Sequence, residues 1–538
     1  MMNGALLQQE ETNARVRHWS ESNQRVGGDS LPGDHVSKYT KSTYVSFRQN
    51  NVDELKEIWE GLDRESRQIF FSTYGDIAYL LYVPVDEPML QALIQFWNPC
   101  YYCFTLNGKD LMPTVEEYTE LLRVPNISGD RVYTKPERGT NFGVCPMDLV
   151  GRSIQWATGL IKKKGGSFGF SWSCIAEITC TYPDPHKKAQ LLAVAIYGFV
   201  IFPRILGYID VAILDLFNQL EHGINPVPAI LAETFISLNA CRELEGGRFR
   251  GCTPMLMVWI KSHFWKTPKT VLPGIGSMYL SPLKEFLAEQ WDEVDPSKWV
   301  EAFRNLQEQD LVWRTPWFST RSFLYTCYVY NWLMLLGLWG GIGCAPLSVS
   351  RQFKSRQFIP FTQGLSESEF AFEGEFKKKI NKIYLSWKHC YRVKSAGSED
   401  NMVTPDYVVW MQIRVNDMIP LPNQGQTMSM GEHLRVIPME ADTLRNELEA
   451  TRVKMEEIKV QHERDMYLAK VEVDKFAGEA EQAMKRYSKL KIKYESRTTT
   501  SKSWKLQSST WSYARLPPNG GKKSNKLRID KRAGLSGN

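Results

Sequence analysis

The sequence lacks the short motifs that mark many nucleotide-dependent and metal-dependent enzymes. It has no phosphate-binding P-loop, no glycine fingerprint for dinucleotides and no EF-hand loop. Its 10 cysteines follow no disulfide-framework spacing and lie in apolar segments, which indicates a reducing compartment. We therefore expect a non-enzymatic protein that uses no cofactor and no metal ion.

Long apolar runs are also scarce. The N-terminal segment contains none, so we predict no secretory signal and expect the nucleus or the cytoplasm, with the nucleus favoured. The uncharged stretch between Arg321 and Arg351 is long enough to span a bilayer, but Asn331, Pro346 and several glycines interrupt it. We predict two buried core elements joined by a glycine turn there, with a membrane helix as the less favoured alternative. The shorter run 191–202 is predicted to be a buried helix.

The overall composition is that of a globular protein. Hydrophobic residues make up 43% of the chain and charged residues 23%, which excludes global disorder. Most of the 17 tryptophans lie between Trp59 and Trp410, so the packed core is expected there. The net charge of +6 is uneven: residues 498–538 hold nine Lys/Arg and one Asp, and subtracting this +8 leaves −2 for the rest. Any weak contact with nucleic acid is therefore expected in the basic tail.

Apolar residues recur at helical spacing through most of this core. Two helix starts carry capping-box patterns, Asn51 with Glu54 and Thr114 with Glu117. A further helix is expected to include Trp97 and to stop before Pro99. Few segments alternate with period two, so we predict a mainly α fold with little sheet. Helices are predicted over residues 51–62, 90–97, 114–122, 186–202, 208–221, 227–244, 252–265, 299–306 and 370–387.

Shifts in composition predict the domain organisation. We expect a mobile N-terminal arm over residues 1–45 and a large helical domain over 46–425. A Pro/Gly-rich stretch at 267–282 is a candidate boundary between two lobes of that domain. A coiled coil over 432–497 and a disordered basic tail over 498–538 complete the chain.

The clearest physical pattern is the heptad seam of the predicted coiled coil. Apolar residues step by alternating threes and fours in two registers, joined by a four-residue insertion after Ile458. We predict that this segment self-associates as a parallel dimer; a single helix packed back onto the globular part is the alternative. The residues expected in the interface are Ile437, Leu444, Leu448, Met455, Ile458, Met466, Phe476, Tyr487 and Leu490.

Two local patterns resemble chemical sites. The G-x-S-x-G sequence around Ser167 resembles a nucleophile elbow, but three lysines, Lys162–Lys164, precede it where an elbow needs a hydrophobic strand. We predict a flexible basic loop instead. Cys100 and Cys103 form a C-x-x-C pair without a second ligand pair at zinc spacing. We interpret them as buried structural cysteines at a helix end.

Two further patterns also have simple interpretations. His263 is predicted to lie near the end of a helix, where a cation is stabilising without any catalytic role. Glu116 and Glu117 are adjacent and therefore point to different helix faces, so we do not expect them to act as an acid/base pair.

Several segments resemble the plant mobile domain family. Residues 110–125 resemble the PT-x-E-x-x-x-LL-x-x-P helix of that family, 191–217 its long apolar helix, and 226–265 the helices that follow. Residues 310–317 resemble its short V-x-W-x-P element. Closer still is a coiled-coil-tailed plant branch known only as the domain of unknown function DUF7745, which the stretches NNVDELKEIW, QFWNPCYYCF, RQFKSRQFIPFTQGL and EHLRVIP resemble.

The resemblance implies a protein that is associated with plant transposable elements or derived from them, in a family without established catalytic residues. Some relatives are nuclear and support transposon silencing as protein-interaction partners. Two functions are favoured, and an enzyme built from residues scattered along the sequence is a remote third. One is an interaction scaffold that the coiled coil multimerises and that binds partners the sequence does not identify. The other is a nucleic-acid-associated, gag-like or transposase-derived factor that uses the basic tail, for which binding would depend steeply on salt.

Overall fold

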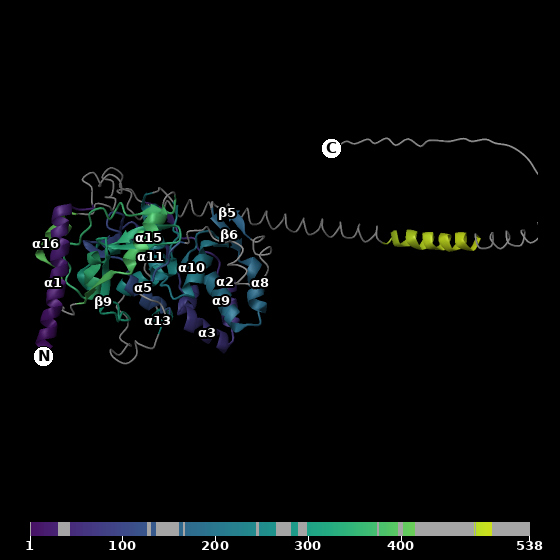
Figure 1. Cartoon of the computed structure of the whole chain (residues 1–538), viewed down its shortest axis with the longest axis horizontal. Coiled ribbons are helices and arrows are strands. Elements are labelled where there is room, and N and C mark those ends of the chain that lie inside the picture. Colours follow the sequence, from purple (N-terminus) through teal and green to yellow (C-terminus); the bar gives the residue numbers. More distant parts are fainter. Residues whose placement is uncertain are drawn as a thin grey trace, which may run out of the picture. The chain divides into compact units, whose positions relative to one another are not determined.

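The chain divides into two compact units, Met1–Glu432 and His433–Asn538, called here the N-terminal unit and the C-terminal unit. Each is described by itself. The computed structural model (Figure 1) describes residues 2–30, 43–125, 131–135, 161–164, 167–243, 247–264, 281–288, 298–373, 376–395, 402–414, 478 and 480–497.

The described part of the N-terminal unit is mainly α-helical, as predicted. The α-helices are α1 (Met2–Gly27), α2 (Asp53–Gly61), α3 (Arg64–Tyr74), α4 (Glu87–Ile94), α5 (Val115–Leu122), α8 (Ser173–Thr181), α9 (Pro185–Ile196), α10 (Ala212–Leu220), α11 (Val227–Glu243), α12 (Thr253–Phe264), α13 (Pro282–Ala288), α14 (Trp299–Arg304), α15 (Phe376–Trp387) and α16 (Pro405–Ile413). Shorter helical turns are η2 (Ile77–Tyr82), the π-helical η3 (Tyr197–Ile201), η5 (Glu308–Asp310) and η6 (Pro346–Phe353).

Short strands form small sheets of two or three strands each within the described residues. The sheets are β1–β8, β2–β3–β4, β5–β6–β7, β10–β11–β12 and β9–β13. The strands are β1 (Val45–Ser46), β2 (Trp97–Asn98), β3 (Cys103–Leu106), β4 (Lys109–Leu111), β5 (Lys162–Lys164), β6 (Ser167–Ser171), β7 (Tyr208–Asp210), β8 (Gly247–Arg248), β9 (Ser322–Cys327), β10 (Leu333–Leu336), β11 (Gly340–Cys344), β12 (Phe370–Ala371) and β13 (Cys390–Lys394).

The core of the N-terminal unit forms around α9 and α11. The apolar run predicted as a buried helix is α9 continued by η3, and its side chains from Leu191 to Ile201 are all buried. Helices α2 and α3 pack against α9, whereas α11 packs against α5 and the β10–β11 hairpin. In Figure 1, α1 and α16 lie at one end of this unit, and α2, α3, α8 and α9 lie at the other.

The middle of the uncharged stretch between Arg321 and Arg351, flanked by β9 and η6, forms two buried strands, β10 and β11, joined by a glycine-containing turn. This confirms the predicted pair of buried core elements. At Gly340 a Cβ atom would lie 2.6 Å from the carbonyl oxygen of Phe370, so the close pairing with β12 requires glycine. Among the residues that the structure describes, no helix has both the length and the apolar character needed to cross a membrane.

Within the range predicted to be a mobile N-terminal arm, the second half of α1 packs against the rest of the N-terminal unit. The Ser20 hydroxyl donates to the carbonyl of Ile359 at 3.0 Å, and the Gln24 side chain accepts from the amide of Thr362 at 2.9 Å. Val16 is buried in a small apolar cluster with residues of η6 and β9. Local sequence does not indicate this packing, because the two hydrogen bonds join polar side chains to backbone groups more than 300 residues away.

Several element boundaries differ from the predictions. The Thr114–Glu117 capping box is present, but Asn51 does not cap α2: its side chain accepts from the Asp53 amide while Val52 occupies the N-cap position. Trp97 lies in β2 because the chain leaves α4 after Ile94 and pairs with β3. The predicted helices 208–221 and 370–387 each begin with a short strand, β7 and β12, before α10 and α15.

Other predictions fall outside the described residues. The proposed lobe boundary lies almost wholly outside them, as do the first half of the coiled-coil seam and the basic tail. In the C-terminal unit the structure describes residue 478 and residues 480–497, which are helical, and every one of these residues is exposed.

Candidate functional site

A buried polar centre forms around Glu117, in the first turn of α5. The Glu117 amide donates to the Thr114 hydroxyl at 3.3 Å, and the Thr114 amide and hydroxyl donate to the Glu117 carboxylate at 3.1 and 3.0 Å. This reciprocal capping box satisfies donors that a helix N-terminus leaves unpaired. It therefore holds the carboxylate close to the helix start and directed into the protein core.

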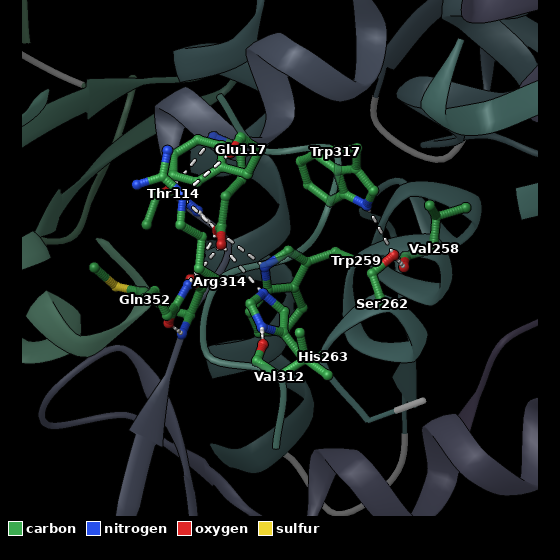
Figure 2. Close-up of polar contacts among 12 residues, drawn as sticks. Thr114, Glu117, Val258, Trp259, Ser262, His263, Val312, Arg314, Trp317 and Gln352 are labelled. Atoms are coloured by element: carbon green, nitrogen blue, oxygen red, sulfur yellow. Dashed lines mark hydrogen bonds and ion pairs between the residues drawn. The ribbon is translucent and has the colours of Figure 1, made fainter. Parts of the chain in front are cut away.

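Three side chains from distant parts of the chain meet the same carboxylate (Figure 2). Trp259 of α12 donates its indole N–H at 3.0 Å, and Gln352 of η6 donates its amide at 2.9 and 3.0 Å. The His263 imidazole, one turn after Trp259, places Nε2 3.1 Å from Glu117 Oε1. Its Nδ1 is 2.8 Å from the carbonyl oxygen of Val312. The centre therefore connects α5, α12, η6 and the chain that follows η5.

The burial of the Glu117 centre decides what it can do chemically. Glu117 is 1% exposed, and Thr114, Trp259, His263 and Gln352 are each 0% exposed. A carboxylate beside a histidine is an arrangement that enzymes use for proton transfer. Here both carboxylate oxygens and both ring nitrogens already have protein partners. The geometry therefore suits a structural connection between elements rather than contact with a substrate.

The neighbouring Glu116 makes separate contacts, in agreement with the predicted divergence of the two side chains. Its Oε1 accepts from the amide of Leu324 in β9 at 2.7 Å and lies 3.6 Å from Arg392 Nη1 in β13. Burial raises the pKa of Glu116 to about 7, although the Leu324 hydrogen bond and Arg392 act in the opposite direction. Glu116 thus connects α5 to the β9–β13 sheet.

A second buried centre pairs Asp110 of β4 with Arg414, which follows α16. The guanidinium donates to the carboxylate from Nη1 and Nη2, at 2.5 and 2.8 Å, and Nη2 also donates to the Thr105 hydroxyl at 3.1 Å. Its Cζ lies 3.8 Å from the ring centroid of Tyr101 and 4.7 Å from that of Trp410. Arg414 is 2% exposed, so the pair anchors the last described residues of the N-terminal unit in its core.

A cavity of about 330 Å³ lies near the C-terminal end of α5. Its charged lining groups are Asp76, Arg123 and Lys284, with Tyr79 and Ser281 beside them. Burial raises the pKa of Asp76, and Ser281 and Arg123 oppose that shift. The mixture of two cations and one carboxyl suits a small polar ligand.

The predicted interface residues are not brought together by the described structure. Tyr487 and Leu490 are 68% and 65% exposed on the helix of residues 480–497. The remaining predicted interface residues lie outside the described part of the chain: Ile437, Leu444, Leu448, Met455, Ile458, Met466 and Phe476.

The two C-x-x-C cysteines are buried, as predicted, but their position differs. Cys103 lies in β3 and Cys100 in the turn before it, rather than at a helix end. Burial raises the pKa of the Cys103 thiol well above its usual value, which disfavours the thiolate that metal binding or redox chemistry needs. Within the described ranges, no three His, Cys, Asp or Glu side chains are grouped closely enough to hold a metal ion.

Ser167 does not occupy the flexible loop that the sequence predicted. It begins β6, which pairs antiparallel with β5 so that Lys164 is opposite Ser167. Lys162 and Lys163 are exposed in this hairpin. Ser167 therefore starts a strand and does not lie in a strand-to-helix turn of the kind that exposes an elbow nucleophile.

Sequence reasoning missed most partners in both buried centres. Thr114 and Glu117 were found because a capping box is a local pattern. His263 does lie in the last turn of α12, as predicted, but its hydrogen bonds to Glu117 and Val312 have no counterpart in local sequence. Arg414 pairs with a residue 304 positions earlier, a separation at which sequence spacing carries no signal.

Comparison with known proteins assigns a family. A family model described as a domain of unknown function, DUF7745, matches residues 55–416. Neither the curated proteins nor the solved structures include a match to the chain. The matched range contains both buried centres, and it covers well over half of the sequence. The chain therefore belongs to the DUF7745 family.

Proposed function

We propose that this protein is a self-associating, non-enzymatic interaction protein, whose helical domain is multimerised by the coiled coil at residues 432–497. The observation that carries the proposal is the helix of residues 480–497, where every residue is exposed. The exposed apolar side chains of this helix are Met484, Tyr487, Leu490, Ile492 and Tyr494, each between 65% and 72% exposed.

The spacing of these side chains supports a second copy as the occupant. Tyr487, Leu490 and Tyr494 step by three and four residues and continue the seam of Ala480 and Ala483. A helix of this length is marginally stable in water when nothing covers its apolar side. Burying the seam against an identical seam would remove that apolar surface from water, at about 25 cal/mol per Å².

The charges of the same helix make the proposal sensitive to salt. Arg486 and Lys491 flank the seam at positions that face each other across a parallel dimer. Their repulsion is screened by added salt, so dimerisation should strengthen as the salt concentration rises. Binding of nucleic acid by the basic tail, the alternative function, would weaken under the same change.

The test is the mass of the full chain in solution, measured by light scattering over a range of concentrations. The double variant Leu444→Ala with Leu448→Ala should dissociate the dimer, since each buried leucine lost costs about 2 kcal/mol or more. Within the described helix, Leu490→Ala removes a seam residue, whereas Ile492→Ala removes an equally exposed residue outside the seam. The Leu490 variant should weaken association and the Ile492 variant should not. A monomeric wild-type chain, or equal effects of the two variants, would contradict the proposal.

The relationship to the wider plant mobile domain family, and an origin in transposable elements, form part of the same proposal. Their support is the motif resemblance, which includes the helix that begins at Thr114. If the resemblance reflects common ancestry, the helix of a plant mobile domain that corresponds to α5 should begin with a capping box whose glutamate meets side chains from two later helical segments, as Glu117 does. An experimental structure of a plant mobile domain with an unrelated fold would contradict it. Nuclear localisation is tested by imaging the tagged chain in plant cells.

A further inference from the structure

The segment formed by α15 and β13 has one sign of charge only. Residues 376–395 contain seven Lys and Arg residues and no Asp or Glu. These basic residues are Lys377, Lys378, Lys379, Lys382, Lys388, Arg392 and Lys394. This concentration of positive charge contrasts with the nearly neutral charge of residues 1–497 as a whole.

The way α15 packs determines which side of it faces solvent. Ile380, Ile383 and Trp387 are buried and attach the helix to the core, with the Trp387 indole donating to the Met334 carbonyl at 2.6 Å. The opposite side is therefore exposed. It presents Lys377, Lys378, Asn381, Lys382, Tyr384, Leu385 and Lys388.

Exposed aromatic rings are present on α15, on β13 and in the loop after β9. Tyr384 is on the exposed side of α15, with Lys388 Nζ 4.8 Å from its ring centroid. Tyr391, in β13, is 48% exposed, and Tyr328, in the loop after β9, is 61% exposed. The Tyr328 amide donates to the His389 carbonyl at 3.1 Å, and the two rings are 5.7 Å apart. The loop after β9 therefore lies directly beside the end of α15.

Few carboxylates neutralise this surface. Arg392 lies 3.6 Å from the buried Glu116, a contact that leaves its side chain 44% exposed. Within the described part of the chain, no carboxylate is within ion-pair distance of Lys377, Lys382, Lys388 or Lys394. These four lysines thus face solvent without a described carboxylate beside them, which favours an anionic ligand.

We propose that α15, β13 and the loop after β9 form a binding surface for single-stranded nucleic acid. Lysines spaced along α15 would contact successive phosphates, while Tyr328, Tyr384 and Tyr391 offer ring surfaces on which unpaired bases stack. The bases of a duplex already stack on each other and would leave the rings unused. An anionic membrane is disfavoured because Leu385 and Val329 are the only large exposed aliphatic side chains of this surface.

The experiment measures binding of the full chain to a fluorescein-labelled oligothymidylate of about 20 nucleotides by fluorescence anisotropy, at several salt concentrations. Three double variants each remove two positive charges. They are Lys382→Gln with Lys388→Gln on the proposed surface, Lys162→Gln with Lys163→Gln in the β5–β6 hairpin, and Lys522→Gln with Lys523→Gln in the basic tail.

The three variants should differ. The α15 variant should bind more weakly and reduce the slope of log K against log salt by about 1.4, since each contact with a single strand contributes about 0.7. The hairpin variant should bind like the wild type. Equal losses in the α15 and hairpin variants would reveal non-specific attraction, and a loss confined to the tail variant would place binding in the tail. Either result would overturn the proposal.

The rings are tested separately from the charges. Tyr384→Ala and Tyr391→Ala should each weaken binding roughly fivefold or more while leaving the salt slope unchanged, because a stacked base contributes without neutralising a phosphate. Unchanged thermal unfolding of the variants serves as the folding control. Equal affinity for a duplex of the same sequence would overturn the proposal. So would binding to phosphatidylserine vesicles without binding to the oligonucleotide.

Discussion

The Asp110–Arg414 ion pair of the N-terminal unit contrasts with the Glu481–Lys485 ion pair of the C-terminal unit. In the N-terminal unit, the side chains of Asp110 and Arg414 are 0% and 1% exposed. In the C-terminal unit, Glu481 and Lys485 are 2.7 Å apart, but their side chains are 67% and 70% exposed. Water and salt screen the second pair, whereas losing one partner of the first leaves a charge in apolar surroundings. The N-terminal unit is thus organised by contacts within the chain. The described helix of the C-terminal unit presents its apolar side chains outward, where another chain can cover them.

The largest expected effect on stability comes from breaking the buried Asp110–Arg414 ion pair. Asp110→Ala leaves the Arg414 charge without its carboxylate, and we expect the free energy of unfolding to fall by about 3–5 kcal/mol. Urea denaturation followed by tryptophan fluorescence measures this loss. The matched control combines Asp110→Leu with Arg414→Met, which removes both charges and should cost much less. A single variant as stable as that control would show that the buried pair has no such role.

A smaller loss is expected at the Glu117 centre. Glu117→Gln replaces an acceptor of several hydrogen bonds by a group that presents one acceptor oxygen and an N–H donor to the same partners. The cost should be about 2–3 kcal/mol, the range for losing hydrogen bonds to a charged group. Thr114→Ser, which keeps the capping hydroxyl, is the control and should change the same urea midpoint little. If Glu117→Gln also leaves the urea midpoint nearly unchanged, the negative charge of Glu117 contributes little to the stability of the fold.

Buried carboxyls of the N-terminal unit should make its stability depend on pH. Burial raises the pKa of Glu116 and of Glu233 from their usual 4.5 to about 7. Between these values the folded chain binds more protons than the unfolded chain, so stability falls as the pH rises. Each carboxyl contributes at most about 1.4 kcal/mol per pH unit. Glu116→Gln and Glu233→Gln should each flatten this dependence in urea unfolding at pH 5 and pH 7. A wild-type stability that rises over this interval and is unaffected by either variant would refute the assignment.

The smallest effect belongs to the exposed pair. Glu481→Ala should destabilise the helix of the C-terminal unit by about 0.3–0.5 kcal/mol, the usual contribution of an i, i+4 pair on a helix surface. Thermal unfolding followed by circular dichroism at 222 nm should shift slightly at low salt and not at all at high salt. A shift comparable to that of Asp110→Ala would mean that the pair is covered, and the contrast between the units would disappear.

The elements that the sequence predicted well depend on local patterns. The capping box of Thr114 and Glu117 lies within one helical turn, and the run from Leu191 to Ile201 is apolar along its whole length. Trp97 was misassigned because its strand pairing with β3 gives no periodic signal over two residues. The N-terminal helix was missed because its packing depends on Ser20 and Gln24, polar residues that composition assigns to solvent.

The sequence by itself determined the mainly helical character, the family and the heptad spacing, since each depends on residues that are close along the chain. Only the tertiary structure decided where Glu117 and Asp110 find their partners. Gln352 is 235 positions from Glu117, and Arg414 is 304 positions from Asp110. Over such separations a contact depends on how whole elements pack, and side-chain spacing in sequence does not encode it.

The surface of α15 and β13 shows both influences. Its lysines are visible in the sequence, but packing of Ile380, Ile383 and Trp387 into the core decides which of them reach solvent together.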